Sequence, residues 1–158
     1  MKIQLDTLSL VVFDRNNIEH INFFKKIALD ATIKNRFTGF LSNLNAKSDS
    51  IIGKAFFLEA NNELIGFIDI GSFSEEEEAI YLRGAIDKEK RGKNYGHKML
   101  EETSNYIFLN YPEVKNIKLK IAHDNTSSIK TAESCGFINT LNDCYQKGNP
   151  YYFKNITK

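Results

Sequence analysis

The sequence IDKEKRGKNYGHK spans residues 86–98 and joins a stretch of strand length to a segment with helical spacing. Backbone N–H groups at the start of a helix lack partners, and the helix dipole favours an anion there. Residues 87–98 hold five Lys or Arg and two Asp or Glu, a local charge of +3, while Gly92 and Gly96 let the backbone turn and approach a ligand. This turn is the expected anion site, and its simpler interpretation is an ordinary glycine-containing turn on a basic surface.

The common nucleotide-binding loops do not fit this stretch. A dinucleotide fold requires GxGxxG with an acidic residue about 20 positions later, and a Walker loop requires GxxxxGK[ST]. Here Gly92 and Gly96 are spaced GxxxG, and Lys98 is followed by Met99. NAD binding and ATP hydrolysis are therefore not expected.

A second motif follows the next predicted strand. It consists of Asn125, Ser128 and Glu133, followed by Gly136 and Phe137, in the spacing N-x-x-S-x-x-x-x-E-x-x-G-F. A polar residue followed by a short helical stretch and then Gly is the usual pattern of a capped helix that ends at a glycine.

Together, the turn and the second motif resemble the GNAT superfamily of N-acetyltransferases. The loop of that family reads [QR]-x-x-G-x-[GA], here RGKNYG at residues 91–96, and its later helix reads N-x-x-S or N-x-x-A before GF. The second motif is similar to the RimJ/RimL-type branch, and the resemblance covers residues 79–137. Asn94 stands where the family usually has Gly. Because Asn accepts a left-handed conformation, we expect the loop to keep its shape.

The resemblance implies acetyl-CoA as cosubstrate, no metal, and direct transfer of the acetyl group to a primary amine. The backbone amides of residues 91–97 would cradle the pyrophosphate, and the pantetheine arm would lie between the strands ending at Ile86 and His123. The N–H of Ile86 would then lie near the thioester oxygen, and Asn125 would bind the arm. The expected acetyl-CoA-binding residues are Ala85, Ile86, Arg91, Gly92, Lys93, Asn94, Tyr95, Gly96, His97, Asn125 and Ser128.

The resemblance to the RimJ/RimL-type branch implies that Ser128 is the proton donor for, or partner of, the departing thiolate. Many members of the family carry a Tyr seven residues after the motif Asn, which here is Ala132, and some carry a Glu five residues before it, which here is Lys120. The alternative role of Ser128 is to satisfy backbone donors in the first turn of a helix.

The general base is left open. His123 and Asp124 precede the motif Asn, and Asp69 and Tyr81 lie on predicted central strands. A base that acts through water, or an amine that arrives neutral, needs none of these groups.

The hydrophobic spacing predicts a mixed α/β fold in the order β-α-α-β-β-β-α-β-α-β-β. The resemblance to the GNAT superfamily implies a central mixed, mostly antiparallel sheet flanked by helices. A turn with a helix N-cap is expected at residues 14–17, two helices within 18–44, and a turn at 71–77. The expected strands are 3–13, 54–59, 64–70, 78–86, 117–121, 137–141 and 151–156, and the later helices are 95–109 and 125–135.

The composition fits one globular domain over residues 1–158, with 42% hydrophobic and 26% charged residues and a net charge of +1. No apolar run approaches the roughly 20 residues of a membrane span, and Asp6 interrupts any signal peptide, so a cytoplasmic protein without membrane contact is expected. Cys135 and Cys144 form no CxxC and are expected to be free thiols. The acidic run at residues 75–78 is interpreted as a solvated turn, with an acidic substrate-binding lip as the alternative.

Two other classes of function are weighed against an acetyltransferase. The missing Tyr and Glu motivate a protein that binds acetyl-CoA without turning it over. A nucleic-acid module fits poorly, because the basic residues cluster at one turn without interleaved aromatics. The acceptor is left open between a protein N-terminus and a small amine such as a polyamine, aminoglycoside, amino acid or amino sugar. Residues 18–50 and 145–152, with Tyr145, Tyr151 and Tyr152, are expected to select it, in a monomer or homodimer.

Overall fold

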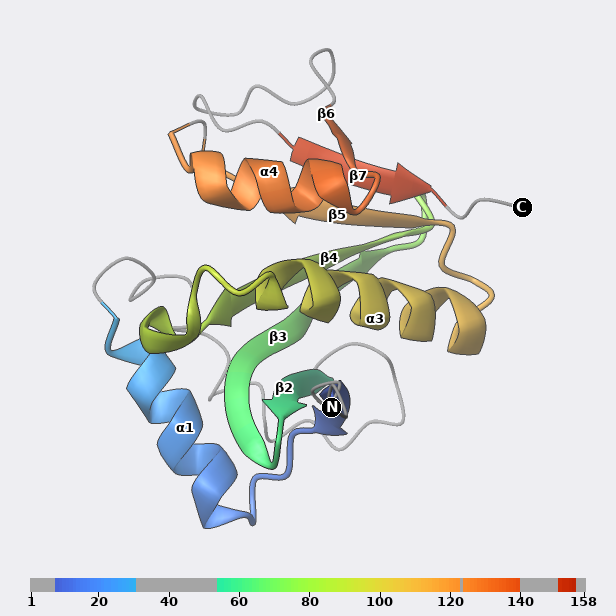
Figure 1. Ribbon diagram of the computed structural model, residues 1–158. Coiled ribbons are helices and arrows are strands. Elements are labelled where there is room, and N and C mark those ends of the chain that lie inside the picture. Colours follow the sequence, from blue (N-terminus) through green and yellow to red (C-terminus); the bar gives the residue numbers. More distant parts are fainter. Residues whose placement is uncertain (1–7, 31–53, 123, 140–150, 156–158) are drawn as a thin grey trace, which may run out of the picture.

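The computed structural model describes residues 8–30, 54–122, 124–139 and 151–155 (Figure 1). In chain order, the elements are β1 (Leu8–Val12), α1 (Ile18–Ala28), β2 (Ala55–Ala60), β3 (Glu63–Ser74), β4 (Ala79–Ile86), the 3-10 turn η1 (Lys88–Lys90), α3 (Tyr95–Asn110), β5 (Asn116–Lys120), α4 (Thr126–Ser134), β6 (Ile138–Asn139) and β7 (Tyr151–Asn155). The predicted second helix would fall at 31–44, and with His123, Cys144 and Tyr145 it lies outside the described residues.

One sheet of seven strands organises the fold, in the order β1-β2-β3-β4-β5-β7-β6. The β4–β5 pair is parallel and the other neighbouring pairs are antiparallel. The predicted mixed, mostly antiparallel sheet with helices beside it is confirmed. The parallel pair follows from the chain itself, because α3 carries it from the end of β4 back to the start of β5.

The β2–β3 hairpin has a two-residue turn, Asn61-Asn62, and both residues have positive φ, 51° and 64°. This is the backbone of a type I′ turn, which matches strand twist and favours Asn. The predicted hairpin around residues 61–63 is therefore confirmed.

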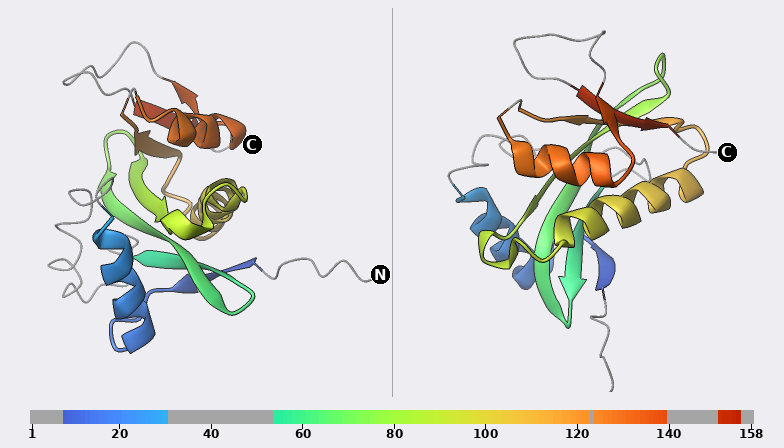
Figure 2. Two further views of the ribbon diagram at one scale, coloured as in Figure 1. Left: turned by 60° about the vertical axis from the view of Figure 1, so that its left-hand side comes forward. Right: turned by 45° about the horizontal axis from the view of Figure 1, so that its top comes forward.

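The two faces of the sheet are covered differently. Helices α3 and α4 lie on one face, and α1 lies on the other (Figure 2, left). The larger apolar cluster, which includes Ile80, Leu82 and Met99, packs between the sheet and α3 and α4. A smaller cluster, which includes Phe24 and Phe67, packs α1 against the opposite face, where these two rings meet edge-on at 5.0 Å.

Two predicted boundaries are wrong. Strand β3 continues to Ser74 instead of ending at residue 70, because it keeps pairing with β4 after an irregularity between Ile70 and Ser72. Glu78 does not begin β4, since its φ of 47° is incompatible with a strand. The acidic side chains at 75–78 are exposed, as expected of a solvated turn. Within the described ranges, no helix is both long and apolar enough to cross a membrane.

The predicted start of α1 and the predicted end of α3 are confirmed. Asn17 caps α1, its side chain accepting hydrogen bonds from the N–H groups of Glu19 and His20. Helix α3 ends at Asn110, two residues before Pro112. Proline cannot continue a helix, which explains the boundary.

Candidate functional site

Strands β4 and β5 part near the start of α3. Their parallel register runs from Ala79↔Asn116 to Leu82↔Leu119, whereas β4 continues to Ile86 beside β3. We call the point after Leu82 and Leu119 the fork; in Figure 2 (right) the two strands diverge from it. The fork is where the sequence analysis expects the pantetheine arm.

The backbone at the end of β4 turns one N–H toward the fork. The N–H of Asp87 donates to Ile65 O of β3, at 2.9 Å. Because backbone groups alternate in direction along a strand, the N–H and C=O of Ile86 point away from β3, to the side that β5 has left. The Ile86 oxygen accepts from Arg91 Nε at 3.1 Å. The Ile86 N–H therefore points into the fork, where the resemblance predicts the thioester oxygen.

The 87–96 loop connects β4 to α3 through two left-handed residues. Gly92 has φ +83°, and Asn94, the N-cap of α3, has φ 64° and ψ 15°. The expectation that Asn94 accepts a left-handed conformation is confirmed. Its side chain makes no capping hydrogen bond, so the cap residue leaves the first-turn N–H groups of α3 unsatisfied. Such a helix start can bind an anion through its backbone.

Gly96 lies in the first turn of α3 and has no positive φ, so the expected turning role belongs to Gly92 alone. A Cβ built on Gly96 would lie 3.5 Å from Thr131 Cγ2 of α4, an ordinary contact. Packing therefore does not require glycine at this position. The sequence suggests another reason for glycine at this position, which is that it lets a ligand approach the backbone.

Several basic side chains of the loop are held by acids from distant segments. Lys90 pairs with Glu63 of the β2–β3 hairpin, and Arg91 pairs with Asp30 beyond α1, both at 2.8 Å. The fold thus offsets part of the local +3 of residues 87–98 with acids that are distant in the sequence.

Among the described residues, the loop cations without an ion pair are Lys88 and Lys93, both exposed. Lys98 lies near Glu101, one turn along α3, at 3.6 Å. Among these residues, the loop cations without an ion pair are thus two exposed lysines. The other donors at the start of α3 are backbone N–H groups.

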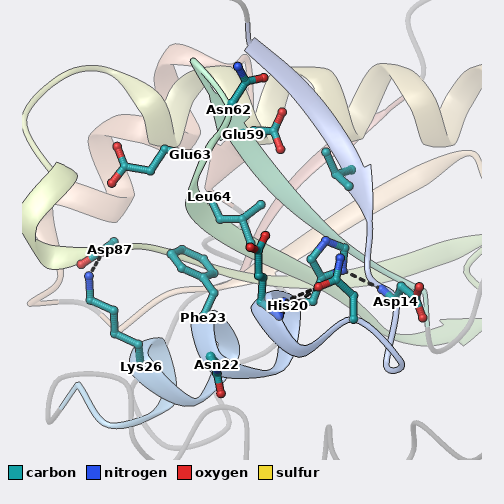
Figure 3. Close-up of a pocket in the computed structure, with 13 residues that line it drawn as sticks. Asp14, His20, Asn22, Phe23, Lys26, Glu59, Asn62, Glu63, Leu64 and Asp87 are labelled. Carbon is teal, nitrogen blue, oxygen red and sulfur yellow. Dashed lines mark hydrogen bonds and ion pairs between the residues drawn. The ribbon is translucent and has the colours of Figure 1, made fainter.

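Asp87 anchors the start of the loop. Its buried carboxylate accepts from Lys26 Nζ of α1 at 2.6 Å (Figure 3). It also accepts from the N–H of Glu89. Burial raises the pKa of Asp87, but these donors outweigh burial and the pKa lies below its usual value. Hydrogen bonds to Asp87 and then Glu89 raise the pKa of Lys26. This pair ties α1 to the end of β4.

The pocket in Figure 3 has a volume of about 730 Å³ and lies between α1, β1 and the β2–β3 hairpin, with Asp87 at one edge. Its buried His20 accepts the Asp14 N–H at Nδ1, 2.9 Å away, so the neutral ring carries its proton on Nε2. The expected acetyl-CoA-binding residues do not line this pocket. It is therefore separate from the fork.

Asn125 and Ser128 lie in the first turn of α4, directly after β5. Asn125 is the N-cap, and its Oδ1 accepts from the Ser128 N–H at 3.2 Å. Ser128 therefore donates its own N–H to the capping side chain of Asn125 and does not itself cap the helix. The capping role, which was the alternative for Ser128, is excluded. Its half-buried hydroxyl takes part in no hydrogen bond with the described residues.

His97 joins α3 to α4 through its side chain. Ser134 Oγ donates to Thr131 O at 2.7 Å, so it accepts the Nδ1–H of His97 at 2.8 Å. Buried, unbridged Cys135 lies 3.4 Å from the same nitrogen. The ring is therefore committed to packing, and any binding role of His97 falls to its backbone N–H.

The two base candidates on the strands, Asp69 and Tyr81, are engaged in other interactions. Asp69 is 2% exposed and is held by Arg83, whose Nε lies 3.2 Å from Oδ1 and whose Nη2 lies 2.6 Å from Oδ2. Burial raises the pKa of Asp69, opposed by Arg83. Tyr81 donates its hydroxyl to Glu77, at the opposite end of β4. Asp124 is exposed beside the cap of α4.

Sequence reasoning missed the Asp69–Arg83 and Lys26–Asp87 pairs. The signal for the first was a single acid inside the apolar run of residues 64–70, since a buried charge in a strand is expected to have a partner. The spacing of residues in the sequence did not indicate that Arg83 would be this partner. No group of three or more potential metal ligands occurs in the part of the chain that the structure describes.

Residues 9–138 match the family model described as acetyltransferase (GNAT) domain. The chain belongs to the GNAT acetyltransferase family. The match takes in the fork, the 87–96 loop and the start of α4, so the resemblance drawn from residues 79–137 is confirmed at the level of the family. No curated protein matches the sequence.

Solved structures of low sequence identity share this GNAT fold. The N-acetyltransferase PseH of Campylobacter jejuni in complex with acetyl coenzyme A is 19% identical, with a TM-score of 0.70 over 95% of this chain and 99% of PseH. A chimera of spermidine N-acetyltransferase SpeG from Vibrio cholerae and hSSAT is 18% identical, with a TM-score of 0.70 over 94% and 95%. RimL, a ribosomal L7/L12 alpha-N-protein acetyltransferase solved with coenzyme A, is 17% identical, with a TM-score of 0.56 over 65% and 62%.

Proposed function

We propose that this protein is an acetyl-CoA-dependent N-acetyltransferase that moves an acetyl group directly to a primary amine. The observation that supports this best is the fork: β4 leaves β5 after Leu82, turns the Ile86 N–H outward, and leads into a loop that ends at the uncapped start of α3. GNAT relatives of this fold are solved with acetyl coenzyme A or coenzyme A.

In this proposal, backbone groups do most of the binding. The N–H groups of residues 91–97, in and after the loop, hold the pyrophosphate, because a helix start offers aligned donors and a favourable dipole. Lys93 and Tyr95 contribute their backbone N–H groups to this pyrophosphate site. Ala85 lies on β4 beside Ile86, where the arm passes. Asn125 keeps its amide nitrogen for the arm, since its Oδ1 is used in the cap.

The chemistry needs a neutral amine, a donor for the developing oxyanion and a proton for the departing thiolate. The Ile86 N–H donates to the oxyanion. Ser128, half-buried and without another hydrogen bond among the described residues, gives the thiolate its proton. The proton lost by the amine leaves to solvent or through water.

Proteins of this fold act on different acceptors. Neighbours of this fold are, by name, acetyltransferases for spermidine, for a ribosomal protein N-terminus and for an aminoglycoside, the last solved with ribostamycin. RimL covers less of this chain than PseH and SpeG do. A RimJ/RimL-like action on a protein N-terminus therefore has less structural support than a small amine.

The deciding experiment measures free thiol released from acetyl-CoA by the purified protein, with and without amines. The panel holds spermidine, ribostamycin, glucosamine 6-phosphate, an amino acid and a peptide with a free N-terminus. Sustained, amine-dependent release supports the enzyme. Tight binding of acetyl-CoA with no amine-dependent release identifies the alternative, a protein that binds acetyl-CoA without turnover. The presence of Ala132 and Lys120 at positions where other family members carry Tyr and Glu would explain that outcome.

A further inference from the structure

The pocket between α1, β1 and the β2–β3 hairpin has an acidic lining (Figure 3). We call it the α1 pocket. Its volume of about 730 Å³ lies in the range of sites that hold small organic molecules. The residues that line it include one lysine, Lys26, and five acids, which are Asp14, Glu19, Glu59, Glu63 and Asp87.

The lysines around the α1 pocket do not balance its acids. Asp87 pairs with Lys26 at 2.6 Å, and Glu63 pairs with Lys90 at 2.8 Å. The other three acids make no ion pair with the residues that the structure describes, and Glu59 among them is half-buried. The wall therefore keeps a surplus of negative charge, which attracts a cation.

His20 adds a hydrogen-bond donor to the wall of the α1 pocket. The residue is 7% exposed, and its ring meets the ring of Phe57 edge-on at 4.9 Å. Its Nδ1 accepts the N–H of Asp14, so the proton of the neutral ring is on Nε2, which points away from Asp14 (Figure 3). The Nε2–H has no hydrogen-bond partner in the described part of the chain. Because a donor without a partner in a buried residue costs free energy, the pocket favours a ligand with an oxygen acceptor.

The acids and His20 together restrict the chemistry of the ligand. An alkylamine or a polyamine matches the acids, but its ammonium groups are donors only and leave the His20 N–H unpaired. A neutral sugar matches His20 and leaves the acids without a counter-charge. Phe23 and Leu64 add apolar surface for a carbon skeleton, and an aromatic ring also attracts a cation. A ligand that carries both an ammonium group and hydroxyl groups meets all of these conditions.

We propose that the α1 pocket binds a hydroxylated organic cation, of the kind of an amino sugar or amino alcohol. Its ammonium group lies among the unpaired acids, and a hydroxyl oxygen accepts the Nε2–H of His20. The expected acetyl-CoA-binding residues do not line this pocket, so binding there does not depend on acetyl transfer at the fork.

The test compares three ring compounds that separate the charge from the hydroxyl groups. Glucosamine has both, glucose has the hydroxyl groups alone, and cyclohexylamine has the cation alone. Isothermal titration calorimetry of the full chain at about pH 7, where the amines are mainly protonated, gives Kd for each compound. We expect glucosamine to bind about tenfold or more tightly than either of the others, since hydrogen bonds to charged groups are the stronger ones.

Nitrogen-15 NMR of the histidine rings locates the bound compound. The chain has three histidines, so the signals are few. Glucosamine should move the Nε2 signal of His20, while Nδ1 stays unprotonated because it keeps the N–H of Asp14. A response confined to the other two histidines would place the ligand elsewhere and overturn the proposal.

Two variants probe the acids. Glu59→Gln and Glu19→Gln each remove one charge and keep the size of the side chain. We expect Kd for glucosamine to rise about threefold or more in Glu59→Gln, whose charge is half-buried, and by less in Glu19→Gln, whose charge is exposed. Glu76→Gln, exposed in the β3–β4 turn, is the matched control and should keep the wild-type Kd.

Four outcomes would overturn the proposal. These are no glucosamine binding at millimolar concentrations, cyclohexylamine binding as tightly as glucosamine, wild-type affinity in both pocket variants with native circular dichroism, and a loss of thiol release in Glu59→Gln that parallels the loss of affinity. The last would make the pocket part of the acceptor site, whereas a separate site leaves thiol release by Glu59→Gln equal to that of the wild type. The first three leave the proposed acetyl transfer intact, because they measure binding without acetyl-CoA.

Discussion

The 87–96 loop and the fork both carry basic side chains that are paired with acids, and the two regions differ in what else they offer. In the loop, Lys90 and Arg91 pair with Glu63 and Asp30 from distant segments, and the start of α3 adds backbone N–H groups that its cap residue leaves unsatisfied. At the fork, Arg83 pairs with the buried Asp69 of the neighbouring strand. The loop therefore has backbone donors beside its side chains, whereas the Arg83–Asp69 pair is made of side chains alone.

The difference explains why one site is recognisable and the other is not. A site made of backbone N–H groups needs left-handed and small residues at a few positions, and Asn94 can replace Gly there. A site made of side chains changes its chemistry with every substitution. Members of one fold can therefore share a cosubstrate and differ in acceptor. Four variants test this contrast, from the largest expected effect to the smallest.

Ser128→Ala should have the largest effect, because it removes a side chain that we place in the chemistry. We expect kcat to fall roughly 100-fold, the usual cost of losing a proton donor. The free energy of unfolding should change by less than ~0.5 kcal/mol, since Asn125 caps α4 through the Ser128 backbone, which Ala keeps. Steady-state thiol release and urea unfolding measure the two quantities. Unchanged turnover would remove Ser128 from the mechanism.

Asp87→Asn tests the side chains that hold the loop in place. The amide still accepts the Glu89 N–H but loses the ion pair with Lys26, so we expect a loss of ~1–3 kcal/mol of unfolding free energy at pH 7. Lys25→Met is the control, because Lys25 is next to Lys26 and equally exposed but makes no ion pair with the described residues.

The same pair fixes the sign of the pH dependence. The folded pKa of Asp87 is depressed, so its contribution is present above the unfolded value of about 3.9 and is lost as pH falls through the folded value. The gap between wild type and Asp87→Asn should thus be constant from pH 7 to about pH 5 and shrink below about pH 4. A gap that grows on acidification would contradict the ion pair.

Gly96→Ala tests whether the ligand, and not packing, requires glycine. The added Cβ makes an ordinary contact with Thr131, and Ala favours helix by up to ~1 kcal/mol, so stability should stay equal or rise. We expect KM for acetyl-CoA to rise about tenfold, because the added methyl group would occupy space through which the cosubstrate approaches the backbone. An unchanged KM for acetyl-CoA would show that the cosubstrate does not approach Gly96.

Lys88→Met combined with Lys93→Met should have the smallest effect. Both side chains are exposed, and exposed charges contribute ~0–1 kcal/mol and are screened by salt. We expect KM for acetyl-CoA to rise less than about threefold at low salt and not at all at high salt. A rise larger than that of Gly96→Ala would mean that the loop binds through side chains, and the contrast with the fork would disappear.

Most secondary structure was predictable because its signals are local. Asn17 before α1, the Asn61-Asn62 turn and Pro112 after α3 each act within a few residues. The errors arose where pairing with a neighbouring strand overrides local composition. Strand β3 runs through Gly71 to Ser74 because β4 is there to pair with it, and no local pattern reports that partner.

The sequence by itself determined the family, the left-handed loop and the capped start of α4, because these depend on residue types at fixed short spacing. Only the tertiary structure decided which acid each of these charges is paired with. Asp30 and Glu63 neutralise the loop, and Asp69 orients Arg83, through contacts whose partners are distant in the chain or on another strand. The physical reason is that a charge acts according to what surrounds it in space, and the sheet brings together groups that the chain keeps apart.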